Sequence, residues 1–259
     1  MPKLAKFLRK IRQRASIEST SEHEREIKAI LEVYGTILWA YTDYNLLNTV
    51  SHITAQPHAQ PPLYTLHKDP IKTWSAGASS LPPDTPPEQQ RACLISNLCD
   101  FGLEITLRPI SAQLQKLGAR ADWLLVSAAP RMLLHFDDKD PEICRHSVLA
   151  VTSKGGEQYI ADFTVEQFGY PEEYWFMKKA DYMEQCTRDG HWRLAGDDDL
   201  KAADQGAEDE LEGDISTRLD NKVRETCRGL DWEKLEKLGR VERIEVVQRT
   251  ARECFASIV

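Results

Sequence analysis

Residues 146–164 read HSVLAVTSKGGEQYIADFT and decide the fold. Two apolar, β-branched stretches, 147–152 and 158–164, flank the turn sequence from Lys154 to Gly156. A glycine pair between two such stretches is typical of a tight turn that joins antiparallel strands. We therefore expect a β-hairpin whose turn lies at Gly155.

The register of this hairpin brings a histidine and an aspartate together. With a three-residue loop, Ser153 pairs with Glu157, and Thr164 lies opposite His146. Side chains alternate between the faces of a strand, so Asp162 lies diagonal to His146 on the same face. A carboxylate there accepts a hydrogen bond from one imidazole nitrogen and leaves the other free to take a proton from a nucleophile.

A cysteine is the nucleophile that we expect beside this base, because a thiolate forms readily next to an imidazolium or at a helix N-terminus. Cys99 is the first candidate and Cys93 the second, since both precede a helical segment, 111–118, that ends at Gly118. The six cysteines contain no CxxC pair, which disfavours a zinc ribbon or a thioredoxin-like motif. They are Cys93, Cys99, Cys144, Cys186, Cys227 and Cys254.

No metal or cofactor site is expected. Cys144 lies two residues from His146, but this pair is not expected to bind a metal.

The order of these features resembles that of the transglutaminase-like superfamily of papain-like cysteine enzymes. The resemblance covers roughly residues 93–170, about a third of the chain, and is most specific over 156–169, which reads GEQYIADFTVEQFG. It implies that Cys99 attacks an acyl carbonyl, that His146 moves the proton and that Asp162 orients His146.

Two features depart from the pattern of this superfamily. Val148 stands two residues after His146, where members often carry tryptophan. Cys99 lies nineteen residues before Gly118, with Pro109 between them, and this stretch is longer than usual by about one helical turn. A proline inside a helix is expected to end or kink it, so Pro109 predicts a break before 111–118.

The resemblance implies an enzyme that forms a thioester and then hydrolyses it, transfers the acyl group to an amine, or cyclises the substrate. The substrate would be acyl or peptide-like. Two alternatives remain open: a catalytically inactive member that acts as a protein-interaction module, and an unrelated α+β domain in which the match is chance.

The fold class that we expect is α+β, with an antiparallel sheet packed on the cysteine-bearing helix and flanking N- and C-terminal helices. Five regions should form one compact domain. They are a helical N-terminal region (1–54), a Pro-rich linker or loop (55–90), the transglutaminase-like core (91–195), an acidic flexible loop (196–215) and C-terminal helices (216–259).

Charge and hydropathy limit the partners. Residues 197–214 hold nine acids and one base, which accounts for the whole net charge of −8. The rest of the chain is near neutral, so no nucleic acid is expected. No apolar run approaches the roughly 20 residues of a membrane span. The oligomeric state is not determined by the sequence.

The cysteines and the N-terminus bear on location. Scattered cysteines and the lack of a secretory signal predict a reducing, cytoplasmic setting. The basic, amphipathic segment 3–14 fits a mitochondrial targeting peptide, a membrane-surface helix or a helix docked on the core.

Overall fold

A five-stranded antiparallel sheet forms the centre of the computed structural model, which describes residues 22–140, 145–196, 198–199 and 214–258. The strand order is β10-β5-β7-β8-β9. The bounds are β5 (Arg120–Ala128), β7 (Arg145–Thr152), β8 (Gln158–Ala161), β9 (Phe176–Lys178) and β10 (Thr187–Leu194). Together with the helices, this antiparallel sheet confirms the predicted α+β class.

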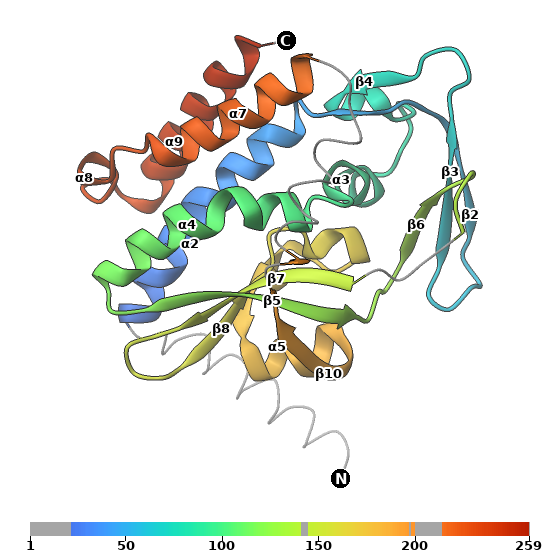
Figure 1. The fold of residues 1–259 in the computed structure, drawn as a ribbon. Coiled ribbons are helices and arrows are strands. Elements are labelled where there is room, and N and C mark those ends of the chain that lie inside the picture. Colours follow the sequence, from blue (N-terminus) through green and yellow to red (C-terminus); the bar gives the residue numbers. More distant parts are fainter. Residues whose placement is uncertain (1–21, 141–144, 197, 200–213, 259) are drawn as a thin grey trace.

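Helices cover both faces of the sheet, four of them on one side (Figure 1). These four are α2 (Glu22–Thr42), α4 (Cys99–Lys116), α7 (Asp214–Arg228) and α9 (Arg240–Ala256). They bury Trp123, Leu149 and Tyr159 from the strands in the main core. The short α5 (Lys179–Cys186) packs on the opposite face, against Val148 and Ile160.

The predicted hairpin is present in the predicted register. Leu149 pairs with Ala161, and the Ser153 amide donates to the Glu157 carbonyl at 2.8 Å. The second strand is shorter than the expected 158–164. Its pairing with β7 ends at Ala161, although the Asp162 amide still donates to the Trp175 carbonyl at 2.8 Å, next to β9. The chain then enters two 3-10 turns, η2 (Val165–Phe168) and η3 (Glu172–Trp175).

Pro109 does not end the helix that contains it, which corrects the break expected there. Helix α4 runs unbroken from Cys99 to Lys116. Proline removes one N–H and crowds an earlier carbonyl, but Ile105 and Ile110 on either side are buried in the main core. Tertiary packing therefore keeps the helix continuous. Its end at Gly118, which has a φ of +71°, agrees with the prediction.

The expected linker over 55–90 contains three strand segments, 55–56, 63–68 and 74–76, and the helical N-terminal region ends at Thr42 rather than near residue 54. A three-stranded sheet has the order β2-β3-β6 and lies to one side of the main sheet (Figure 1). β2 is mostly exposed and polar, whereas β3 and β6 are mostly half-buried. Because β6 comes from about 70 residues further along the chain, no local pattern in 55–90 indicates this sheet. The remaining elements are β1 (Leu46–Asn48), β2 (Val50–Gln56), β3 (Leu63–Lys68), β4 (Trp74–Ala76), η1 (Gly77–Ser80), α3 (Pro87–Ile95), β6 (Leu133–Phe136) and α8 (Trp232–Leu235).

Some expectations lie outside the described residues. They concern the basic segment 3–14 and most of the acidic loop 196–215. The C-terminal helices expected over 216–259 are present as α7, α8 and α9. In the described part of the chain, none of the helices has the length and apolar character needed to cross a bilayer.

Candidate active site

The predicted His146–Asp162 pair is in contact at the end of the hairpin. His146 is the second residue of β7, and Asp162 follows the last residue of β8. The imidazole Nε2 lies 2.7 Å from the carboxylate Oδ2, and each residue is only 1% exposed. Both face α5, since they alternate with side chains that pack on α4. The ring edge of His146 also packs against Phe168, with centroids 4.7 Å apart.

The Asp162 carboxylate has hydrogen bonds to both oxygens. Oδ1 accepts from the Thr164 amide at 3.0 Å and the Thr164 hydroxyl at 3.3 Å. Oδ2 accepts from the Tyr182 hydroxyl at 2.7 Å in addition to His146. Four donors fix the orientation of this buried carboxylate, which in turn fixes the imidazole.

The pKa of His146 reflects this pairing. Burial is the largest influence and lowers the pKa, but the Asp162 charge and hydrogen bond outweigh it, and Cys99 adds to the upward shift. The net result raises the pKa of His146 from 6.5 to about 10. The ring is therefore an imidazolium at neutral pH.

Cys99 is the first residue of α4 and is half-buried. Its thiol donates weakly to Asp100 Oδ1, at 3.7 Å, and interacts with the His146 ring closely enough to influence its pKa. The second ring nitrogen, Nδ1, is buried and has no aligned hydrogen-bond partner in the described residues. Cys99 is thus one of the groups that surround the imidazole, while its aligned hydrogen bond goes to Asp100.

Cys93, the second candidate nucleophile, lies in a core instead. It packs with Val50, Leu66 and Leu94, and burial raises the pKa of its thiol to about 12. Burial likewise raises the pKa of Cys186 and of Cys227 to about 12. These thiols behave as small apolar side chains. Cys254 is half-buried on α9, and Cys144 lies outside the described residues.

The loop before α4 is tied to the carboxylate by a chain of hydrogen bonds. Asn97, with a φ of +64°, forms the sharp turn between α3 and α4. Its amide donates to Gln167 Oε1 at 3.3 Å, and Gln167 Nε2 donates to the Thr164 hydroxyl at 2.8 Å. Thr164 in turn donates to Asp162. The segment that carries the thiol and the segment that carries the carboxylate are thus directly connected.

Two of the donors to Asp162, Thr164 and Tyr182, were not expected from the sequence. Thr164 lies inside the stretch 156–169 that carries the resemblance, but nothing there marks it as a donor. Tyr182 lies on α5, beyond the resemblance, and no local signal marks it.

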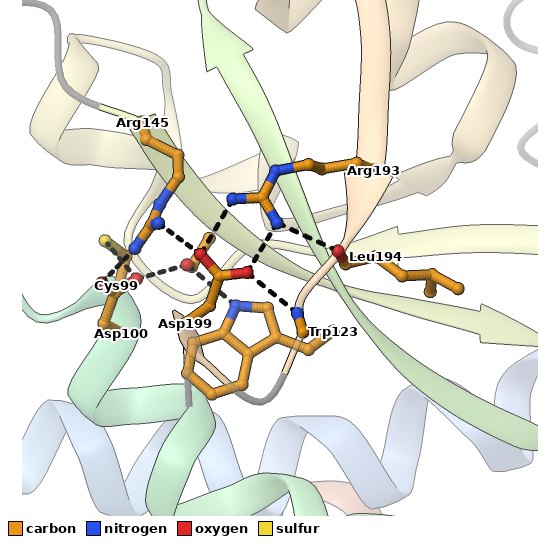
Figure 2. A network of polar contacts seen from close by, with 9 residues as sticks. Cys99, Asp100, Trp123, Arg145, Arg193, Leu194 and Asp199 are labelled. Atoms are coloured by element: carbon orange, nitrogen blue, oxygen red, sulfur yellow. Dashed lines mark hydrogen bonds and ion pairs between the residues drawn. The ribbon is translucent and has the colours of Figure 1, made fainter. Parts of the chain in front are cut away.

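A polar network surrounds the thiol on its exposed side (Figure 2). Arg145 bridges Asp100 Oδ2, at 3.3 Å, and Asp199 Oδ1, at 2.6 Å. Arg193 holds the same Asp199 with two bonds of 2.5 and 2.8 Å. These guanidinium groups hold the pKa of Asp199 well below its usual range; the bond from Arg193 is the largest cause. Asp100 also accepts from Ser147, which is itself bonded by the Trp123 indole.

Two hollows adjoin the site. The first, about 10 Å³, is lined by Cys99, Ser147, Phe163 and Thr164 and has room for about one water. The second, about 310 Å³, lies between α2, the η2–η3 segment and α9. Phe163 lines both hollows, and Asp162 lines the larger one, so the larger pocket adjoins the His146–Asp162 pair.

Comparisons with known proteins add no relative. No model of a known protein family matches the chain, and neither the curated proteins nor the solved structures contain a significant match. Among the described residues, no three His, Cys, Asp or Glu side chains are grouped as metal ligands.

Proposed function

We propose that the chain is a transglutaminase-like thiol enzyme, an acyltransferase or an amide or thioester hydrolase that uses Cys99, His146 and Asp162. The observation that carries the proposal is the buried His146–Asp162 pair next to a cysteine at a helix start. The imidazolium stabilises a thiolate on Cys99, and Asp162 holds the ring in place.

The reaction would proceed in two halves. The Cys99 thiolate attacks the acyl carbon, and the bond to the leaving group breaks while His146 gives its proton to that group. His146 then takes a proton from water or an amine, which attacks the thioester and releases the thiolate. Helix α4 has no side-chain cap, so its first backbone N–H groups are available to a developing oxyanion.

An inactive interaction module is the second candidate function, and one observation favours it. The hollow that contains the Cys99 side chain holds about one water and no acyl group. Catalysis therefore requires that a neighbouring side chain move aside when the substrate binds. Phe163 is a candidate, because it lines both this hollow and the larger pocket.

Thiol reactivity tests the proposal. The chain is treated with iodoacetamide at pH 6 and each cysteine is followed by mass spectrometry. Cys99 should react first, because a thiolate is needed for alkylation. Cys99→Ala should remove this fast phase and His146→Ala should slow it strongly. Cys254→Ala, which removes the other half-buried thiol of the described residues, should leave it unchanged.

Acyl transfer is tested with a second reagent. p-Nitrophenyl acetate should leave an acetyl group on Cys99 that is lost on reaction with water or an added amine. If Cys99 reacts no faster than Cys254 and no acetyl adduct forms on the folded protein, the proposal of an enzyme is wrong. The inactive interaction module is then the remaining candidate function.

A further inference from the structure

The larger pocket combines aromatic walls with carboxylates. Trp39 from α2, Trp175 from η3 and Phe163 form apolar sides of the 310 Å³ space. This volume falls within the usual size of small-ligand sites. A pocket of this kind selects its ligand through the few charged groups that line it.

Those charged groups are mainly acidic. Glu32, Glu166, Glu172 and Glu245 line the pocket, whereas Arg240 is the only basic residue among the lining side chains of the described structure. Net negative charge in a partly enclosed space favours a cationic ligand.

The ion pairs at the pocket leave part of this charge uncompensated. Arg240 is bound in a fork by Glu32, with its Nε 3.0 and 2.9 Å from the two carboxylate oxygens. Arg91, from α3, pairs with Glu166 and reaches Glu172 at 3.4 Å. Asp162 also lines the pocket but pairs with His146. Two guanidinium groups thus face the four glutamates, and Glu245 has no ion pair with the described residues.

The tryptophans of the pocket already attract cations within the chain. The Arg91 guanidinium lies 5.5 Å from the centre of the Trp39 ring, and the Lys28 ammonium lies 5.5 Å from that of Trp175. A planar guanidinium stacks on aromatic faces and pairs with carboxylates in a fork, which a compact ammonium does not do. The walls and the charges therefore suit a guanidinium better than an amine.

We propose that this pocket binds an arginine side chain of a peptide ligand. The pocket adjoins the proposed catalytic centre, because Asp162 and Phe163 line it and Phe163 also lines the hollow at Cys99. A bound arginine would therefore place the neighbouring peptide groups near Cys99. This placement rests on the proposed function, whereas binding in the pocket does not.

Binding is measured by calorimetry on the whole chain with Cys99→Ala, which removes thiol chemistry. The probe is N-acetyl-L-arginine amide, and N-acetyl-L-citrulline amide is its neutral counterpart of nearly equal shape. We expect the arginine probe to bind at least about tenfold more tightly, a difference of about 1.4 kcal/mol. Salt should weaken binding, since the pocket opens to solvent. Binding should also change the fluorescence of the pocket tryptophans.

Two variants on one helix locate the site. Glu245→Gln should weaken binding of the arginine probe about threefold to tenfold, in line with the loss of one exposed charge. Glu253→Gln makes the same charge change on α9 outside the pocket and should have no effect. Equal affinity for the two probes, or equal effects of the two variants, would overturn the proposal.

The outcomes for the pocket and for the thiol are distinguishable. If Cys99 proves inert while the arginine probe still binds, only the enzyme proposal fails. If Cys99 is reactive and the arginine probe binds neither to the wild-type protein nor to Cys99→Ala, only the pocket proposal fails.

Discussion

Replacing Tyr182 with phenylalanine tests whether the buried carboxylate depends on its fourth donor. The Tyr182 ring is 1% exposed and its hydroxyl donates to Asp162 Oδ2 at 2.7 Å. Tyr182→Phe keeps the ring and removes one hydrogen bond to a charged group, which contributes about 1.5–3 kcal/mol. Asp162 would keep three donors. We therefore expect the free energy of unfolding to fall by about 2 kcal/mol.

A neighbouring tyrosine provides the matched control. The Tyr170 hydroxyl lies 2.6 Å from the Ala129 carbonyl and 2.8 Å from that of Gln185, and both acceptors are neutral. Because the hydroxyl has one proton, Tyr170→Phe should cost about 1 kcal/mol. Urea unfolding measures both variants, and the dependence on urea should be unchanged if only the native state is affected.

The two variants are compared by how far each lowers the free energy of unfolding. If Tyr182→Phe destabilises the protein no more than Tyr170→Phe, the carboxylate does not need its fourth donor. Thiol alkylation adds a second measurement. It should slow only modestly in Tyr182→Phe, since His146 keeps its own bond to Asp162.

Three further predictions concern the charges at the site. The pKa of His146 is about 10 in the folded state and 6.5 in the unfolded state. The stability that its protonation contributes is therefore fully present below pH 6.5, decreases as the pH rises, and is gone above about pH 10. Urea unfolding should show a slope of at most about 1.4 kcal/mol per pH unit between pH 6.5 and 8.5, and a flat profile would contradict the raised pKa. Asp162→Asn should slow alkylation of Cys99 by more than about tenfold. The loss should be smaller than the roughly 10⁴-fold loss in a serine triad, because a thiolate forms more readily than an alkoxide. An unchanged rate in the folded variant would contradict the role of Asp162. Arg145→Gln leaves the Asp100 charge uncompensated beside the sulfur and should slow alkylation at pH 6 about threefold to tenfold. Adding Asp100→Asn should restore the rate. If a double-mutant cycle shows no coupling between the two residues, the Asp100 charge does not control the reactivity of the thiol.

The sequence predicted the hairpin and its register because their determinants are local. The glycine pair sets the turn, and strict alternation sets which side chains share a face. His146 and Asp162 could therefore be paired from sixteen residues of sequence. The choice between Cys99 and Cys93 could not be made in this way, since it depends on which of them is buried by β2 and β3.

The remaining features depend on residues that are distant in the chain. Thr65 pairs with His135 in the three-stranded sheet, and no local pattern reports such a pairing. The acidic pocket is assembled from α2, η3 and α9, so its charge balance appears only after folding. Tyr182 meets Asp162 across twenty residues, through a helix whose docking the sequence does not specify.

The hydrogen-bond chain from Asn97 to Asp162 has a consequence for dynamics. The turn that carries the thiol and the turn that carries the carboxylate share the side chain of Gln167, so opening η2 releases both at once. The nucleophile and the group that orients its base therefore belong to one cooperative unit. Amide exchange at Asn97 and at Thr164 would report the same opening event, on a timescale slower than side-chain motion.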